Sequence, residues 1–344
     1  MLAVGIVANP ASGKDIRRLV AYGTVFDNQE KVNIVRRVLL GLAAAGVEEV
    51  IYMPDYYGIV PQAVSGLSTR HRLPLKVTAL DMELTGTQID SYHAALEMSR
   101  AGAGCIITMG GDGTNRMVAK GCGEVPLLPI STGTNNVFPE MVEGTIAGLA
   151  AGVVACGRFC AEEAIHPTKK LVISKNGIQV DIALIDAVVL KDIFIGSRAV
   201  WDPERLRQVV VTRGEAYNIG ISSIAGNLEP VGIAEPKGLA IEFGEDVILI
   251  MAPIAPGLIH PVRVSGYRSL NIDESVAVLD VPCVIALDGE REVEVKEGEE
   301  AAIKLTFNGP RVVDIKIALR EAVVRGYSRG EEARRLLDCL KEDN

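Results

Sequence analysis

The chain has 344 residues, which predicts two or three domains at roughly 100–200 residues per domain. Hydrophobic residues make up 48% of the sequence and charged residues 23%, enough apolar material for a full core without disulfide or metal staples. The 35 basic and 44 acidic residues give a net charge of −9, which disfavours nucleic acid or an anionic membrane as a main partner. A local basic pocket for a phosphorylated ligand is compatible with this charge.

The start of the chain lacks the pattern of a targeting segment, because no positive charge precedes its apolar run and the first charge is Lys14. No apolar stretch is both long enough and free enough of proline to predict a membrane span. The six cysteines are scattered, which favours reduced thiols. We therefore expect a cytoplasmic protein.

The first 142 residues alternate between two periodicities. Short apolar runs predict strands at 3–8, 50–53, 75–80, 105–109 and 125–130. Helical spacing of apolar residues predicts helices at 28–45, 87–100 and 114–120. Strands that alternate with helices indicate a Rossmann-like, three-layer α/β domain with a mostly parallel sheet over residues 1–142.

Residues 143–317 are predicted to form a second domain that is β-rich and sandwich-like. A helix at 143–156 joins the halves, and turns such as Asn176-Gly177 and Asp288-Gly289 separate the strands. Strands are predicted at 171–174, 179–185, 187–190, 208–212, 239–243, 246–251, 276–279, 283–287, 292–295, 301–307 and 312–317. The acidic run 290–300 is interpreted as a solvated hairpin face. Helices within 318–344 are expected to pack back on the first domain.

The sharpest motif is a glycine-rich loop between the predicted strand 105–109 and the helix that follows it. It consists of Gly110, Gly111, Asp112, Gly113 and Thr114. Such glycines let backbone N–H groups approach a phosphate, and the helix N-terminus adds a partial positive charge. Asp112 would face the ligand as a base for a hydroxyl or as an indirect metal ligand. The alternative is an ordinary turn whose aspartate caps the helix.

Two further polar loops follow predicted strands. The first contains Asn9, Pro10, Ser12, Gly13 and Lys14, and it could hold a triphosphate with Lys14, Arg17 or Arg18 as countercharge. The second, residues 131–136, is rich in hydroxyl and amide groups that suit a nucleotide or a sugar. Either loop taken alone is also common without function. Parallel topology would bring all three loops to one edge of the sheet, where ligands bind in open α/β folds.

These residues carry a family resemblance. GGDGT after an Asn-Pro-x-Ser-Gly turn resembles the NAD kinase and diacylglycerol kinase superfamily. Similar segments follow in order at 183–186, 219–223, 252–256 and 287–289. The segment 219–223 resembles a strand that leads into a hydroxyl-rich substrate loop in NAD kinases. The most similar group is the ATP-NAD kinase-like proteins that include the acetoin-catabolism X protein.

The resemblance implies a kinase with its active site in a cleft between the two domains. Asp112 would deprotonate the acceptor hydroxyl, most simply the 2′-hydroxyl of NAD, while ATP phosphates lie against the loops at 9–14 and 110–114. Mg²⁺ would be held through the phosphates rather than by protein ligands. The acceptor side would comprise Thr132, Gly133, Thr134, Asn135, Asn136, Asp186, Ser222 and Ser223. The resemblance also implies a homodimer or homotetramer.

The sequence departs from the family pattern at the acceptor side. Ile185 occupies the place of an asparagine that helps hold adenosine in NAD kinases, which leaves Asp186 as the only acceptor of that pair. The loop 131–136 resembles the lipid-kinase pattern about as well as the NAD kinase one. Two alternatives to an NAD kinase therefore stay open. They are a lipid or other small-alcohol kinase, and a nucleotide-binding regulator that has lost catalysis.

Overall fold

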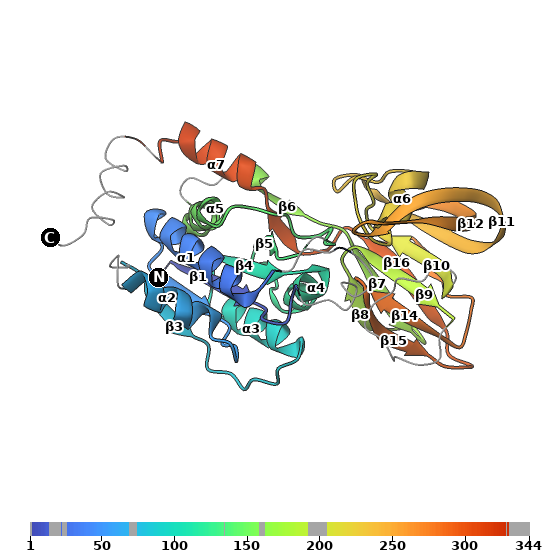
Figure 1. Ribbon diagram of the computed structural model, residues 1–344, viewed down its shortest axis with the longest axis horizontal. Coiled ribbons are helices and arrows are strands. Elements are labelled where there is room, and N and C mark those ends of the chain that lie inside the picture. The colour runs from blue at the N-terminus through green and yellow to red at the C-terminus, as the bar shows by residue number, and fades with distance from the viewer. Residues whose placement is uncertain are drawn as a thin grey trace.

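The protein has two domains, an α/β domain and a β-rich domain, placed side by side along the long axis (Figure 1). The computed structural model describes residues 2–13, 22, 26–68, 74–133, 135–157, 162–191, 205–327 and 329. The first sheet is mostly parallel and the other two are antiparallel. The predicted fold class is therefore confirmed.

A seven-stranded sheet in the order β3-β2-β1-β4-β5-β17-β6 forms the centre of the first domain. Its strands are β1 (Ala3–Ala8), β2 (Glu49–Tyr52), β3 (Lys76–Ala79), β4 (Cys105–Gly110), β5 (Leu127–Ser131), β6 (Ile165–Pro167) and β17 (Arg311–Val313). All neighbours pair in parallel except β17 and β6. The central strands β1, β4 and β5 are buried along their whole length, because helices cover both faces of the sheet.

Helices form the two outer layers of this domain. One face packs against α1 (Asn28–Ala44), α2 (Ile59–Ser68), α5 (Gly144–Cys156) and α7 (Ile315–Val324), and the other packs against α3 (Ile89–Arg100) and α4 (Asp112–Gly121). In Figure 1, α5 and α7 lie above the strands of this sheet and α3 lies below them. None of the helices in the described part of the chain has the length and hydropathy of a membrane span.

Helix α2 is absent from the predicted elements. It contains Pro61 and Gly66, both weak helix formers, so its local preference is poor. Tertiary packing overrides that preference, because the helix packs on α1. Gly66 leaves room for the guanidinium of Arg36, which donates from Nη2 to the Gln62 carbonyl at 3.3 Å.

The seven-stranded sheet extends beyond the predicted boundary at residue 142. Helix α5 is apolar on nearly all sides and is covered by α1 and α7, so it belongs to this layer rather than to a linker. Gly41 and Gly148 let α1 and α5 approach closely, since a Cβ at Gly148 would lie 2.3 Å from the Val38 carbonyl. Strands β6 and β17 also lie past residue 142. The predicted boundary therefore leaves out three elements of the first domain.

The end of the described chain returns to the first domain. Ala318 and Ala322 on α7 are fully buried. The Tyr327 hydroxyl donates to the carbonyl of Ala44 at 3.3 Å. The strand predicted at 312–317 ends at Val313 in the structure, where β17 spans Arg311–Val313. It ends there because Asp314 is the N-cap of α7, and its carboxylate accepts from the Ile317 N–H. Residues 330–344 of the predicted C-terminal helices lie outside the described residues.

The second domain is a sandwich of two antiparallel sheets. One has the order β12-β11-β10-β9-β14-β15 and the other β13-β16-β7-β8. Their strands are β7 (Lys170–Lys175), β8 (Ile178–Ala183), β9 (Asp186–Leu190), β10 (Leu206–Val211), β11 (Lys237–Ala255), β12 (Leu258–Asn271), β13 (Ser275–Ala277), β14 (Cys283–Leu287), β15 (Glu290–Val295) and β16 (Ala301–Thr306). Inward-facing residues such as Ile173, Val189, Ile285 and Ile303 fill the core between the sheets.

Two predictions in this domain are corrected by the structure. The strands predicted at 239–243 and 246–251 are one long strand, β11, with an irregular register between Phe243 and Ile248. The strand-like segment 219–223 instead leads into helix α6 (Ser222–Leu228). Gly220 has φ +104°, which takes the backbone out of the extended conformation, and the Ser223 hydroxyl then bonds back to the Gly220 carbonyl at 2.6 Å.

Candidate active site

Three polar loops meet at the carboxyl edge of the parallel sheet. They follow β1, β4 and β5, which are neighbours in the sheet order, so the topology brings their ends together as expected. The Asn9 side-chain amide donates to the Thr114 hydroxyl at 2.9 Å, which joins the first loop to the second. The hydroxyls of Ser12 and Thr132 lie 3.0 Å apart and join the first loop to the third.

A buried lysine holds the first loop in shape. The Lys31 ammonium on α1 donates to the carbonyls of Asn9 and Ser12 at 2.8 and 2.7 Å, and to the Asn28 side chain at 3.1 Å. Gly13, which follows Ser12 in this loop, has φ +74° and lies against the Thr132 carbonyl. A Cβ at Gly13 would come within 2.8 Å of that carbonyl oxygen. Lys14, a predicted phosphate ligand, lies outside the described residues.

The glycine-rich loop leads directly from β4 into helix α4. Gly111 is the N-cap residue of α4, and no side chain caps the first turn of this ten-residue helix. A Cβ at Gly110 would lie 2.5 Å from the Thr114 side chain, and one at Gly111 would lie 2.8 Å from Asn136 Oδ1. The two glycines therefore let the Thr114 and Asn136 side chains pack closely against the loop, beside N–H groups of α4 that lack a side-chain cap.

Asp112 connects this loop to the loop after β5. Its carboxylate accepts from the backbone N–H of Phe138 at 2.7 Å and of Val137 at 3.1 Å. Arg213 from the second domain donates to the carbonyl of Val137 at 2.8 Å, and its guanidinium carbon lies 5.4 Å from the Phe138 ring centre. Burial lowers the pKa of Arg213, while the negative charge of Asp112 acts in the opposite direction. A carboxylate and a guanidinium thus flank the same short segment.

A second arginine connects the two domains. Arg116, one turn along α4 from Asp112, is fully buried. Its guanidinium reaches three carboxylates of the β-rich domain, at 3.3 Å for Asp181, 3.7 Å for Asp288 and 3.7 Å for Glu290. Glu290 starts strand β15 of the predicted hairpin, and its side chain is 43% exposed, so it meets the buried Arg116 from a solvated face. Its carboxylate also lies against Gly113 of the glycine-rich loop, about 3 Å from where a Cβ would be.

Asp288 organises the strand that carries Asp186. It occupies the turn between β14 and β15 with φ +50°, and its carboxylate accepts from the N–H groups of Leu184, Ile185 and Asp186 at 2.8 to 3.3 Å. Burial raises the pKa of Asp288 to about 6, although the charge of Arg116 opposes that shift. Asp288 thereby links the start of β9 to the arginine on α4.

The loop after β5 contains both satisfied and unsatisfied side chains. The Asn136 amide donates to the Ser131 hydroxyl at 2.8 Å, so it holds the loop together. Thr132 is buried and its hydroxyl lies next to Ser12. Both polar atoms of the Asn135 side chain are shielded from solvent, and neither has a hydrogen-bond partner among the described residues. Gly133 lies within this loop, whereas Thr134 lies outside the described residues.

The predicted acceptor residues of the second domain have different surroundings. Asp186 is buried at the start of β9. The Ser222 hydroxyl is buried with no partner in the described part of the chain, whereas Ser223 is satisfied by the Gly220 and Pro253 carbonyls. Ile185 packs with Phe138 and Leu184 in a small apolar cluster between the domains. The residue that departs from the NAD kinase pattern is therefore part of the core.

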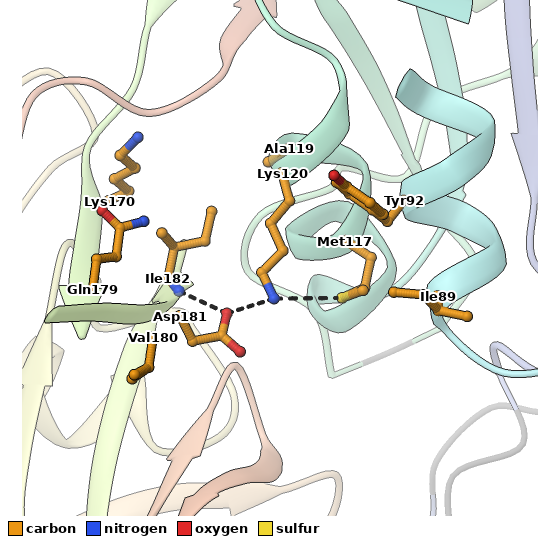
Figure 2. A pocket seen from close by; sticks show the side chains of 10 residues that line it. All are labelled: Ile89, Tyr92, Met117, Ala119, Lys120, Lys170, Gln179, Val180, Asp181 and Ile182. Atoms are coloured by element: carbon orange, nitrogen blue, oxygen red, sulfur yellow. Dashed lines mark hydrogen bonds and ion pairs between the residues drawn. The ribbon is translucent and has the colours of Figure 1, made fainter. Parts of the chain in front are cut away.

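A separate cavity of about 430 Å³ lies between the domains, further along α4. Figure 2 shows Lys120 of α4 reaching across it to Asp181 of β8, with a 2.6 Å ion pair. Met117 and Tyr92 line the side of the first domain. None of the predicted site residues lines this cavity. Among the described residues, no group of three or more histidine, cysteine or acidic side chains is arranged to hold a metal ion.

Sequence reasoning missed the charged residues that shape the site: Lys31, Arg116, Arg213 and Glu290. Lys31 and Arg116 do carry a signal, because each is a cation among buried positions of a helix. A buried cation needs a polar partner, so its position in the sequence indicates a polar site in the folded protein. Arg213 and Glu290 have no comparable local pattern, since their partners come from distant parts of the chain.

Comparisons with known proteins match each half of the chain to a family. The ATP-NAD kinase N-terminal domain family matches residues 4–159, and the acetoin catabolism protein X C-terminal domain family matches residues 169–308. Acetoin catabolism protein X of Cupriavidus necator is 43% identical over 330 residues, which cover 93% of this chain and 92% of that protein. An NAD kinase of Thermoplasma acidophilum is 27% identical over 236 residues, 66% of this chain and 80% of that protein.

A solved structure shares the fold. Yeast NADH kinase, complexed with NADH, aligns with a TM-score of 0.50 and 12% identity, over 93% of this chain and 85% of that chain. The two family matches follow the two halves of the chain, and the full-length relative covers both. This chain therefore belongs to the ATP-NAD kinase-like family, in the group of acetoin catabolism protein X.

Proposed function

We propose that the protein is a kinase that transfers the terminal phosphoryl group of ATP to an alcohol. The observation that carries the proposal is the meeting of three polar loops around the α4 N-terminus, where no side chain caps the first turn. Asp112 lies at this point, between the two domains. The likeness to the Thermoplasma acidophilum NAD kinase supports the same activity.

The phosphates of ATP would lie against two loops. Backbone N–H groups at Gly111, Gly113 and Thr114 would bind phosphate oxygens, and Asn9, Pro10, Ser12 and Gly13 would form the facing wall. Lys31 fixes that wall by binding its carbonyls. Mg²⁺ held by the phosphates would neutralise charge on the transferred group.

Asp112 would act as the general base. Its carboxylate takes the proton of the acceptor hydroxyl, the oxygen forms a bond to the γ-phosphorus, and the bond to the β–γ bridging oxygen breaks to release ADP. The backbone N–H groups of Val137 and Phe138 donate to this carboxylate and fix it in position.

The acceptor would be the 2′-hydroxyl of NAD, which gives NADP. The side chains proposed to line it are Thr132, Thr134, Asn135, Asn136, Asp186, Ser222 and Ser223, with Gly133 in the same loop. The solved relative that binds a dinucleotide has the same fold. The Asp288 carboxylate accepts from the backbone N–H groups of both Ile185 and Asp186. These hydrogen bonds fix the backbone of Asp186, although Ile185 beside it packs in the core.

The test is NADP formation from NAD and Mg-ATP by the purified protein, with Asp112→Asn measured beside it. We expect wild-type turnover and a loss of roughly 10²–10⁴-fold in the variant. ADP release with another alcohol, and none with NAD, would keep the kinase and reject the acceptor. Full activity of a folded Asp112→Asn protein would reject Asp112 as the base. No turnover with NAD or other alcohols, together with tight NAD or ATP binding, would identify a nucleotide-binding regulator.

A further inference from the structure

The cavity of about 430 Å³ between the domains is lined by none of the groups of the proposed reaction. Its walls are α3 and α4 of the first domain and β7 and β8 of the second, and Figure 2 shows the side chains that line it. Pockets that bind small molecules are commonly about 300–1,000 Å³ in volume and lie preferentially between domains. The size and place of this cavity therefore fit a small-molecule ligand.

One cation in this cavity has no partner in the described part of the chain. Lys170, the half-buried first residue of β7, makes no hydrogen bond or ion pair with any described residue. Partial burial lowers the pKa of its ammonium, because the charged group has lost some of its hydration. The other cation, Lys120, is already paired with Asp181 at 2.6 Å. An anion bound beside Lys170 would compensate for the hydration that its ammonium has lost.

The charges around the cavity leave a positive surplus. The charged residues that line it are two lysines and a single carboxylate, Asp181. This carboxylate is shared, since Arg116 donates to it at 3.3 Å from the neighbouring turn of α4. The chain as a whole has a net charge of −9, so a cavity with a positive surplus is set apart from the rest of the molecule. Such a local charge favours an anionic ligand.

The rest of the lining suits a ligand that also has an apolar body. Ile89 on α3 and Val180 on β8 are large aliphatic side chains that stay 36% and 46% exposed. Covering them with a ligand removes apolar surface from water, which is favourable. The Gln179 amide and the Tyr92 hydroxyl also line the cavity and have no hydrogen-bond partner among the described residues. Both are therefore available to orient a ligand.

We propose that this cavity binds a small organic anion that has an apolar body, with the anionic group at Lys170. The site is separate from the phosphate loops but shares a helix with them. Asp112, Arg116 and Lys120 follow one another at intervals of four residues, so they lie along one side of α4. A ligand in the cavity would therefore contact the same helix that carries the proposed base.

Fluorescence titration of the full chain with two probes tests the proposal. Anilinonaphthalene sulfonate is an aromatic anion, and N-phenylnaphthylamine has the same rings without the sulfonate. We expect wild type to bind the anionic probe, and Lys170→Met to weaken that binding by about 3- to 10-fold, because the variant lacks the cation that pairs with the sulfonate. The affinity for the neutral probe should stay within about 2-fold of wild type.

A second variant changes the charge of the cavity without changing its shape. Gln179→Glu is isosteric and adds a negative charge to the lining. It should weaken the anionic probe by about 2- to 5-fold and leave the neutral probe within about 2-fold of wild type. Thermal melts of both variants verify that they are folded.

Lys304→Met is the matched control. It makes the same change of charge as Lys170→Met in the same sheet, but at an ion pair with Asp273 outside the cavity. It should change the affinity for neither probe.

Three results would overturn the proposal. They are a wild-type protein that does not bind the anionic probe, wild-type affinity for that probe in both cavity variants, and an equal loss of affinity in Lys170→Met and Lys304→Met. None of these measurements needs phosphoryl transfer, so such a failure would leave the proposed kinase function standing.

Discussion

The two sides of the proposed cleft differ in how their polar groups are satisfied. On the phosphate side, Asn9, Ser12 and Lys31 bond to the loops around them. On the acceptor side, Asn135 and Ser222 have no partner in the described chain. The side chains of the proposed phosphate side are therefore held in place by their hydrogen bonds, whereas these two side chains of the proposed acceptor side are not, although Asn136 and Ser223 beside them are. The following variants test this difference.

The largest loss of stability is expected where Arg116 of α4 joins the first domain to the β-rich domain. Arg116→Met leaves the buried Asp288 carboxylate without its arginine partner and removes one of the two cations beside the partly buried Asp181, so the free energy of unfolding should fall by about 3–5 kcal/mol. Urea denaturation measures it. Lys120→Met is the control, since it removes a partly exposed ion pair to the same Asp181 and should change stability by about 1 kcal/mol or less. Equal losses in the two variants would contradict the assignment of Arg116 as the main link.

The next effect is a pH dependence at Asp288. Its pKa in the folded protein is raised to about 6, so the folded state binds this proton more tightly than the unfolded chain does. Between about pH 4 and 6, wild-type stability should therefore fall relative to Asp288→Asn as pH rises, by up to about 3 kcal/mol. Urea titrations at several pH values measure the difference. Asp81→Asn, at an exposed position, is the control, and its stability relative to wild type should not change over this pH range. If wild-type stability instead rises with pH relative to Asp288→Asn, the predicted direction is wrong.

A third variant disrupts the proposed phosphate side. Lys31→Met removes the donor for the Asn9 and Ser12 carbonyls, which should lower the free energy of unfolding by about 1–3 kcal/mol and weaken ATP binding. Thermal melts and ATP titration measure the two effects. Lys76→Met removes an exposed ion pair with Glu49 and should affect neither. Unchanged ATP affinity in Lys31→Met would show that the loop keeps its shape without the lysine.

The smallest effect compares one serine from each side. Ser12→Ala removes the hydroxyl bonded to Asn9 and Thr132, and should lower stability by about 1 kcal/mol. Ser222→Ala removes a hydroxyl that has no partner in the described chain, and should leave the stability of the free protein unchanged or raise it. Differential scanning calorimetry without ligand measures both. If Ser222→Ala lost more stability than Ser12→Ala, the Ser222 hydroxyl would have a stabilising partner, and the proposed difference between the two sides would be wrong.

Much of the first domain was predictable because its signals are local. The apolar runs before Asn9, Gly110 and Ser131 are fully buried strands, and the polar loops follow directly. Helix α2 was missed, since Pro61 and Gly66 weaken its local pattern and packing on α1 compensates. The segment at Gly220 resembles a strand of NAD kinases, but here it turns into α6, with φ +104° at Gly220.

The sequence by itself determined the fold class, the three polar loops and the family. Periodicity sets the order of strands and helices, and parallel order brings the loop ends together. Only the tertiary structure decided which charges meet, because Arg116 lies far along the chain from Asp181, Asp288 and Glu290. It also decided that Asn136 and Ser223 are satisfied while Asn135 and Ser222 are not. Hydrogen-bond partners depend on distances between chain-distant atoms, which no local pattern of residues specifies.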